Sequence, residues 1–271
     1  MTAFPLDRVL LVIPTLGQRT DLLSQAVSSV GLQEGCVVDL VVVTPSGSPA
    51  ERIADDTAVR VVTDPGRGLS AALNAGLAAA NSKCQYFGWL GDDDLLRPKA
   101  LAAAVAALRA EPEAVMVYGW CDYVDAEGHT FFVSRAGPWA ARIIGYGPDL
   151  IPQPGSLMRL SAVRAVGGLD ESLKFALDLD LFLRIRRHGR LLALPQTLAA
   201  FRWHADSLTV ANQKQSIDEA DQVRRRHLNG FASATWPIWR WPLRWSLAAV
   251  KVLVKRRASI LLEQRSGSLS V

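Results

Sequence analysis

The sequence predicts an α/β fold in which a mostly parallel β-sheet is flanked by helices, and three observations support this. Apolar runs that suit buried strands alternate with segments of helical periodicity over residues 8–90. These runs are continuous, as expected for parallel strands that are covered on both faces. Strict alternation of strand and helix is typical of a single parallel sheet with helices on its faces.

The expected elements follow one another without an internal repeat. The first strands are expected at Arg8–Ile13, Val37–Val43, Val59–Val62 and Gln85–Leu90. The helices between them are expected at Thr20–Val30, around Glu51 and at Gly68–Ala80. Residues 113–200 are more mixed, with strands near Val115–Trp120 and Thr130–Val133 and a helix from about Leu177 to His188. Because ligands bind beyond the carboxyl ends of such strands, the loops after the first four strands are expected to form one site.

Composition and cysteine content place the chain among ordinary globular proteins. A chain of 271 residues can bury one large core, or one core with a C-terminal appendage, and its 49% apolar and 21% charged residues are ordinary for a globular protein. Cys36, Cys84 and Cys121 are widely separated, which predicts packed thiols in a reducing compartment and neither a disulfide scaffold nor a zinc site. The N-terminus shows no signal-peptide pattern, and no uncharged apolar stretch reaches the roughly 18 residues that a transmembrane helix requires.

Charge is distributed unevenly along the chain. From Arg224 onwards there are ten Lys and Arg residues and one acid, Glu263, whereas residues 1–223 carry a net charge of −5. A basic segment after a slightly acidic body concerns the partners of that segment more than the fold. We therefore expect a catalytic domain at residues 1–222 and a basic, Trp-rich helical extension at residues 223–271.

Three consecutive carboxylates, Asp92, Asp93 and Asp94, follow the fourth expected strand. Adjacent acids repel one another, so something must offset that cost. Hard oxygen ligands suit Mg²⁺ or Mn²⁺, which take further oxygen atoms from a diphosphate. The alternative is a solvated loop in which one Asp caps a helix that begins near Pro98.

The order of several motifs resembles that of the inverting glycosyltransferases of family 2, which have the GT-A fold. The resemblance covers roughly Arg8 to Thr209 and predicts sugar transfer from a nucleoside-diphosphate donor to a hydroxyl acceptor. The matching segments are Pro14-Thr15, Gly68 to Gly76, Gly91 to Asp94, Ile151 to Ser156, Gly167 to Glu171 and Ala176 to Arg184.

The resemblance implies a donor and metal site at these segments. Asp92 would contact the nucleotide ribose or the metal, Asp93 would be the principal ligand of Mn²⁺ or Mg²⁺, and Asp94 would be a ligand or support one. His204 would lie close to the metal and the diphosphate, although lone histidines are as often structural. Further donor contacts are expected from Pro14, Thr15, Arg67 and Asn74.

The chain departs from the family pattern at two places. Family members often have an acid where this chain has Gly91, which leaves open which two of the three carboxylates act. Many members also carry an Asp after the second strand that reads the nucleotide base. Here that segment is Thr44-Pro45-Ser46, so the identity of the nucleotide stays open.

Asp178 is the expected catalytic base, because it matches the acid of the family at the start of the corresponding helix. Inversion requires a carboxylate that takes the proton from the attacking hydroxyl. Apolar neighbours raise the pKa of a carboxyl group towards a useful value. Asp178 could instead be a helix N-cap, and Asp180 could form an i,i+4 ion pair with Arg184. Gln153 and Asp180 are expected on the acceptor side.

The C-terminal segment combines four tryptophans between Trp236 and Trp245 with interleaved arginines and later lysines. Tryptophan with Lys and Arg is typical of a helix that lies at the surface of an anionic membrane. The segment could alternatively pack on the catalytic domain or on a second subunit. A nucleic-acid partner is not expected, since no such module accompanies it. We expect a cytoplasmic protein that is peripheral on the inner face of the cell membrane and acts on a lipid-linked acceptor.

Two other functions compete with glycosyl transfer. A sugar-phosphate nucleotidyltransferase would have a glycine-rich loop with a basic signature after the first strand, and residues 14–19 lack that richness. A membrane-associated scaffold with a decayed site would be expected to have lost some of its carboxylates, whereas Asp92 to Asp94 and Asp178 are all present.

Overall fold

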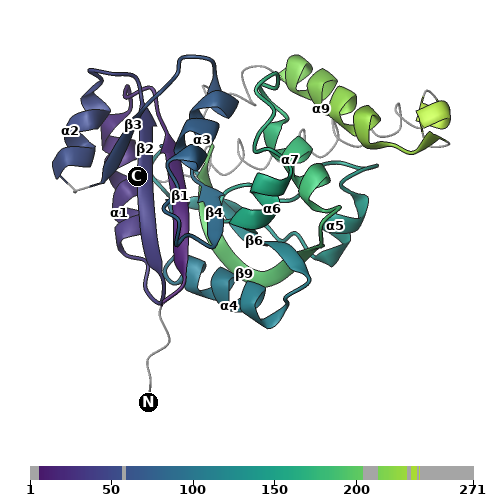
Figure 1. Cartoon of the computed structure of the whole chain (residues 1–271), viewed down its shortest axis with the longest axis horizontal. Coiled ribbons are helices and arrows are strands. Elements are labelled where there is room, and N and C mark those ends of the chain that lie inside the picture. Colours follow the sequence, from purple (N-terminus) through teal and green to yellow (C-terminus); the bar gives the residue numbers. More distant parts are fainter. Residues whose placement is uncertain (1–5, 57–58, 204–212, 231–232, 237, 239–271) are drawn as a thin grey trace, which may run out of the picture.

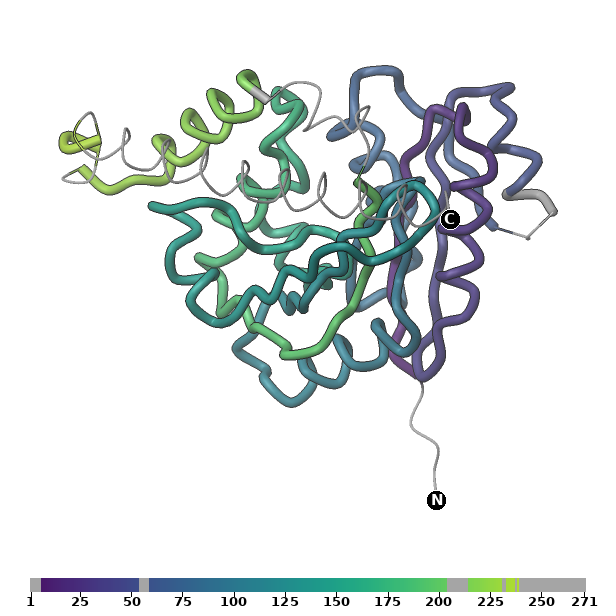
Figure 2. Tube along the Cα trace, turned by 180° about the vertical axis from the view of Figure 1, so that it is seen from behind, coloured from purple at the N-terminus to yellow at the C-terminus, as the bar shows by residue number. Residues whose placement is uncertain are grey.

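The computed structural model describes residues 6–56, 59–203, 213–230, 233–236 and 238. These residues form an α/β fold built on one curled sheet of nine strands. Figure 1 shows strands β1, β2 and β3 on one side of the molecule and α9 on the opposite side, next to α7. The view from behind in Figure 2 shows the same arrangement, with the purple and blue N-terminal part on one side and the yellow-green helix α9 on the other.

The strand order is β3-β2-β1-β4-β8-β6-β9-β5, and β7 pairs with β6 outside this path. The strands are β1 (Arg8–Pro14), β2 (Val37–Thr44), β3 (Arg60–Thr63), β4 (Tyr86–Trp89), β5 (Leu95–Leu96), β6 (Ala114–Val124), β7 (Thr130–Ser134), β8 (Leu157–Arg159) and β9 (Arg190–Arg202). The helices are α1 (Thr20–Gly31), α2 (Pro49–Asp56), α3 (Leu69–Ala78), α4 (Ala100–Ala110), α5 (Pro138–Ile143), α6 (Leu160–Ala165), α7 (Leu177–Ile185) and α9 (Gln213–His227).

Helices cover both faces of the sheet, which explains why β1 is apolar at successive positions. Leu10 and Val12 belong to the core that includes residues of α3, α6 and α7. Val9 and Leu11 face the other way, into the core that includes residues of α1 and α4. Because successive side chains of a strand point to opposite faces, a strand between two helical layers needs apolar residues at both.

The expected α/β fold with helices on the faces of one sheet is confirmed, and the sheet is mixed. Pairings β1–β2, β1–β4, β2–β3 and β6–β9 are parallel, and the other four are antiparallel. Three of the parallel pairings lie in the N-terminal region, where strands and helices alternate strictly, and the fourth is β6–β9. Strands β6 and β7 form a hairpin, whereas the other antiparallel pairs join strands that are distant in the sequence, which the periodicity of single segments does not reveal.

Two expected boundaries differ from the structure. The helix expected to run to His188 ends at Ile185. The division expected between residues 222 and 223 falls inside α9, and α9 contacts α7. The division itself stays a prediction. Cys36, Cys84 and Cys121 are free and buried, as expected. No helix in the described ranges is long and apolar enough to cross a membrane.

The packing of α3 on β1 generates a stability prediction at Gly76. A Cβ atom at this position would lie 2.5 Å from Cγ1 and 2.8 Å from Cγ2 of Val12. We expect Gly76→Ala to lower the free energy of unfolding by about 1–2 kcal/mol, because overpacking outweighs the gain in helix propensity. Urea unfolding measures this. Gly31→Ala is the matched control, since a Cβ there meets nothing within 4 Å. An equal effect of both substitutions would contradict the close-packing explanation.

Candidate functional site

The carboxyl ends of β1 and β4 bring Thr15 and Asp92 together. These strands are parallel neighbours, so the loops that follow them start at the same edge of the sheet. The hydroxyl group of Thr15 donates a hydrogen bond of 2.6 Å to Oδ2 of Asp92, and both side chains are buried. Burial raises the pKa of Asp92, although the bonds from Thr15 and Arg19 oppose this shift.

Arg19, in the loop between β1 and α1, supplies positive charge to two of the three carboxylates. Its guanidinium donates to Oδ2 of Asp93 at 2.5 Å and also pairs with Oδ1 of Asp92. The Arg19 side chain remains 41% exposed, so one side of this ion pair is open to solvent. The sequence analysis missed Arg19, because a single arginine in a loop carries no pattern that distinguishes it from a solvated residue.

Asp94 is turned into the protein and is held by the end of β9. Its Oδ1 accepts a hydrogen bond of 3.0 Å from the backbone N–H of Arg202, and its side chain is buried. Burial raises the pKa of Asp94 well above its usual value, and the charge of Asp93 adds to this. The buried Arg202 guanidinium donates to the carbonyl oxygen of Asp93 at 3.1 Å and to Oε1 of Gln25 at 3.0 Å. Arg202 is a second residue that the sequence analysis missed.

Gly91 has a packing reason to lack a side chain. A Cβ atom there would lie 2.8 Å from Oδ2 of Asp94 and 2.9 Å from Oδ1 of Asp93. The acid that family members often carry at this position would crowd both carboxylates. At the other departure from the family pattern, the buried hydroxyl group of Thr44 is 2.6 Å from Oγ of Ser48. Thr44 is thus engaged within its own loop.

The segment that leads to α7 is held against α3 by Asn74. Its Nδ2 donates to the carbonyl oxygen of Leu169 and its Oδ1 accepts from the N–H of Leu169, both at 2.9 Å. Nδ2 also donates to Oε1 of Glu171 at 3.2 Å, and Arg67 pairs with Oε2 of Glu171 at 2.9 Å. The buried hydroxyl group of Ser70 donates to the carbonyl oxygen of Leu173 at 2.9 Å. Two expected donor contacts, Arg67 and Asn74, therefore connect α3 with the acceptor-side segment in this structure.

Gln153 makes a second connection between the two parts of the candidate site. Its Nε2 donates a hydrogen bond of 2.8 Å to the carbonyl oxygen of Trp89, the last residue of β4. The segment that contains Gln153 therefore lies at the same strand end as the acidic loop. Its expected role on the acceptor side stays a prediction.

Asp178 and Asp180 occupy different environments on α7. Asp178 is partly exposed, and its Oδ1 accepts a hydrogen bond of 2.8 Å from the N–H of Leu179. Burial raises the pKa of Asp178, which the N–H bond opposes in part. Asp180 is buried, and Arg184 donates to it at 2.6 Å, which confirms the expected i,i+4 ion pair. Burial by itself raises the pKa of Asp180, but hydrogen bonds from His227 and Arg184 hold this pKa below its usual value.

Asp149 is a further carboxyl group near Asp178 that the sequence analysis missed. Burial and the charge of Asp178 together raise the pKa of Asp149 to about 7, against the effects of the Ile151 N–H and of Arg224. Two carboxyl groups that share one environment resist losing both protons. Nothing in the sequence around Asp149 distinguishes it from an ordinary loop residue.

The remaining expected site residues are Pro14 and His204. Pro14 is the last residue of β1 and precedes Thr15 directly. His204 lies outside the described residues. A separate group, Asp125, Glu127 and His129, brings three possible metal-binding atoms within 4.8 Å of one another in the turn between β6 and β7. Glu127 and His129 are exposed, and exposed acidic groups of this kind are common without an ion.

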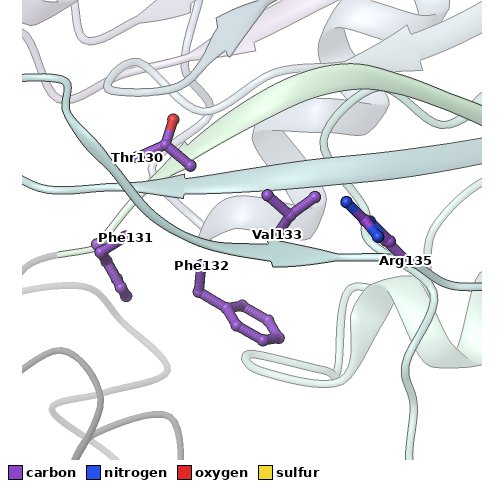
Figure 3. Close-up of a pocket in the computed structure, with 5 residues that line it drawn as sticks. All are labelled: Thr130, Phe131, Phe132, Val133 and Arg135. Atoms are coloured by element: carbon purple, nitrogen blue, oxygen red, sulfur yellow. The ribbon is translucent and has the colours of Figure 1, made fainter.

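A shallow hollow of about 420 Å³ lies along β7 and is lined by Thr130, Phe131, Phe132, Val133 and Arg135. Figure 3 shows the rings of Phe131 and Phe132 on the same side of the strand. The register of β7 against β6 shifts beside this point, which is how a bulge turns consecutive side chains to one side. None of the expected site residues lines this hollow, so it is distinct from the carboxylate site.

The chain is similar in sequence to known glycosyltransferases. The profile described as "Glycosyl transferase family 2" matches residues 10–164. The O-antigen biosynthesis protein RfbC of Myxococcus xanthus is 34% identical over 134 residues, which are 48% of this chain and 10% of that protein. An uncharacterized glycosyltransferase of Rickettsia typhi is 26% identical over 165 residues, which are 58% of this chain and 50% of that protein. The chain thus spans half or less of the length of these relatives.

Two solved structures show the same architecture. The mannosyltransferase PcManGT from Pyrobaculum calidifontis, in complex with GDP-Man and Mn²⁺, has a TM-score of 0.66 at 15% identity. The match covers 98% of this chain and 81% of the PcManGT chain. TarS of S. aureus, in complex with UDP-GlcNAc, has a TM-score of 0.60 at 14% identity. The match covers 86% of this chain and 74% of the TarS chain. These likenesses confirm the expected GT-A fold. Since the family profile matches more than half of the sequence, the chain belongs to glycosyl transferase family 2.

Proposed function

We propose that the protein transfers a sugar from a nucleoside-diphosphate donor to an acceptor hydroxyl group, with inversion at the anomeric carbon and with Mn²⁺ or Mg²⁺. The observation that carries this proposal is the connection of two carboxylate sites at one edge of the sheet. Gln153 joins residues 151–156 to the end of β4, while Ser70 and Asn74 join the segment before Asp178 to α3. The similar structures hold UDP-GlcNAc in one case and GDP-Man with Mn²⁺ in the other, which supports a nucleotide-sugar donor.

The donor and metal end of the site is formed by Asp92 and Asp93. Their carboxylate oxygen atoms are hard ligands that suit Mg²⁺ or Mn²⁺, with Asp93 as the principal ligand. A divalent cation bound there stabilises negative charge on the departing diphosphate. Arg19 already balances the charge of both carboxylates and adds positive charge at the same place. Asp94 keeps its proposed role as a ligand through its second oxygen, since Oδ1 is engaged by Arg202.

At the acceptor end, Asp178 is the proposed base. A carboxylate whose pKa is raised is a stronger base, and burial raises the pKa of Asp178. It takes the proton from the attacking hydroxyl group, while Gln153 and Asp180 support the acceptor side. Asp180 does so indirectly, because Arg184 and His227 occupy its two oxygen atoms.

We further propose that the acceptor belongs to the synthesis of a cell-surface polysaccharide or glycolipid and is lipid-linked, on the cytoplasmic side of the membrane. The name of the relative RfbC, an O-antigen biosynthesis protein, supports the polysaccharide. The basic, Trp-rich segment after Gly230 supports a membrane surface.

Metal dependence is the first functional prediction. With a panel of nucleotide sugars, we expect release of a nucleoside diphosphate in Mn²⁺ and its loss in EDTA. Pyrophosphate as the product would indicate a nucleotidyltransferase, and no turnover with any donor would favour the inactive scaffold. Full activity in chelator would remove the metal from the mechanism.

Calorimetry separates metal binding from turnover. Asp93→Ala should weaken nucleoside-diphosphate binding in Mn²⁺ by about tenfold or more, because it removes the principal oxygen ligand. The exposed Asp21→Ala serves as the control and should bind normally. If both variants bind as the wild type does, Asp93 is not a ligand.

The role of Asp178 gives the second functional prediction. Asp178→Asn should retain the fold and donor binding but lower kcat by about 10²- to 10⁴-fold, the usual contribution of a general base. Asp180→Asn should instead lower the free energy of unfolding by about 2–4 kcal/mol, because it breaks a buried network with Arg184 and His227. Steady-state kinetics and urea unfolding on both variants test this. A normal kcat in Asp178→Asn with a dead Asp180→Asn would reverse the assignment.

Reversible membrane docking is the third functional prediction. The basic charge available for it is smaller than the sequence suggests, since Arg224 is buried and Arg226 pairs with Asp170 at 3.0 Å. Residues after Gly230 still carry seven Lys and Arg residues and one acid, and lie largely outside the described residues. Each basic residue near an anionic surface contributes about 1 kcal/mol, which salt screens.

Truncation after Gly230 should therefore abolish sedimentation with phosphatidylserine vesicles, while turnover of a soluble acceptor analogue continues. High salt should release the full-length protein, and phosphatidylcholine vesicles are the control. Equal binding to both kinds of vesicle, or a truncated protein that does not fold, would indicate that the segment packs on protein.

A further inference from the structure

The N-cap residue of the helix that carries Asp178 supplies no side-chain cap. Ala176 is the N-cap residue of α7, and no side-chain cap hydrogen bond is made from it. Asp178 is the second residue of the helix and accepts the N–H of Leu179, one of the free amides of the first turn. The amides just before the helix therefore need an acceptor from elsewhere.

Glu219 of α9, which lies more than forty residues further along the sequence, supplies that acceptor. Its Oε1 accepts the N–H groups of Lys174 at 3.0 Å, Phe175 at 2.6 Å and Ala176 at 2.7 Å. Oε2 accepts the N–H of Lys174 at 3.1 Å. Three successive amides that converge on one oxygen atom form an anion-binding nest at the positive end of a helix. The carboxylate thus fixes the backbone that leads into Asp178.

Further contacts of α9 hold Glu219 in this place. Nε2 of His227 lies 3.1 Å from Oδ1 of Asp180, so the far end of α9 also meets α7. Arg226 pairs with Asp170 in the segment that Asn74 holds to α3. Both views show α9 lying beside α7 (Figures 1 and 2).

Several charged groups lie near Asp178 or near its neighbour Asp149. Asp149 lies in the loop before β8, and α9 contributes Glu219, Asp221 and Arg224. The buried Arg224 lies 3.6 Å from Oδ1 of Asp221 and attracts the charge of Asp149. On α7 itself, Asp180 pairs with Arg184 and lies 3.1 Å from Nε2 of His227. Burial is the largest cause of the raised pKa of Asp178, and hydrogen bonds from backbone N–H groups lower this pKa. The negative charge of Glu219 raises it further.

We propose that Glu219 is a positioning residue for Asp178. The Glu219 carboxylate fixes the three amides that lead into α7 and places a second negative charge beside the base. The geometry stands independently of the activity, while the catalytic consequence rests on the proposed function. Two substitutions separate the two effects. Glu219→Gln retains an oxygen atom at the Oε1 position but removes the charge, and Glu219→Ala removes both.

The first measurement does not depend on turnover. In Glu219→Ala, the amides of Lys174, Phe175 and Ala176 should exchange with solvent faster by about tenfold or more, because their acceptor is gone. They should stay largely protected in Glu219→Gln. Carboxyl NMR titration should show the pKa of Asp178 moving down in both variants, since a like charge is removed. Glu111→Gln is the matched control, because it removes the charge of an acid that pairs with Arg190 away from α7.

Kinetics supply the second measurement. In Glu219→Gln the acid limb of the kcat profile should move to lower pH, because a base with a lower pKa stays ionised in more acidic solution. In Glu219→Ala, kcat should fall by about ten- to a hundredfold through lost positioning, with donor binding unchanged. Unchanged amide exchange in Glu219→Ala, or an unchanged Asp178 titration in both variants, would overturn the inference. An inactive wild type with the expected exchange and titration would refute the proposed function and leave the positioning contact intact.

Discussion

Electrostatic repulsion among Asp92, Asp93 and Asp94 is the constraint on which the arrangement of the site depends. Groups from two distant parts of the chain stabilise the carboxylates. Thr15 and Arg19 follow β1, whereas Arg202 ends β9. The acidic loop can therefore exist in this form only when β1, β4 and β9 end near one another. The cost of placing like charges side by side thus selects one arrangement of the strand ends.

The three carboxylates are consequently not equivalent. Asp94 is buried against the backbone of Arg202, while Asp93 faces the partly exposed guanidinium of Arg19. Gly91 leaves the space that both acids occupy. Asp94 is thus held by the backbone of the protein, whereas the counter-charge of Asp93 is a guanidinium that is partly open to solvent.

The region around Asp178 follows a different principle, since hydrogen bonds to backbone groups position it. Asn74 and Ser70 hold the preceding segment to α3, and Glu219 holds the last residues before the helix. These acceptors and donors come from both sides of the site. The start of α7 is therefore fixed by α3 and by α9 together. Through α9, the site is also connected to the C-terminal segment of the chain.

The sequence alone determined the features that depend on local pattern. Continuous apolar runs such as Arg8–Ile13 require helices on both faces, so the α/β class and the parallel N-terminal half could be predicted from them. The acidic loop at the end of β4 and the Asp180–Arg184 pair four residues apart could be read in the same way.

Only the tertiary structure decided which distant residues complete the site. The Arg202 amide meets Asp94 from 108 positions away, Arg19 reaches Asp93 across 74, and Glu219 meets Ala176 across 43. These pairings follow from the strand order, which places β9 parallel to β6 and antiparallel to β5, and from the docking of α9 on α7. The periodicity of a segment shows which of its faces is buried, but not which other segment covers that face. Long-range partners of single polar side chains are therefore settled by packing alone.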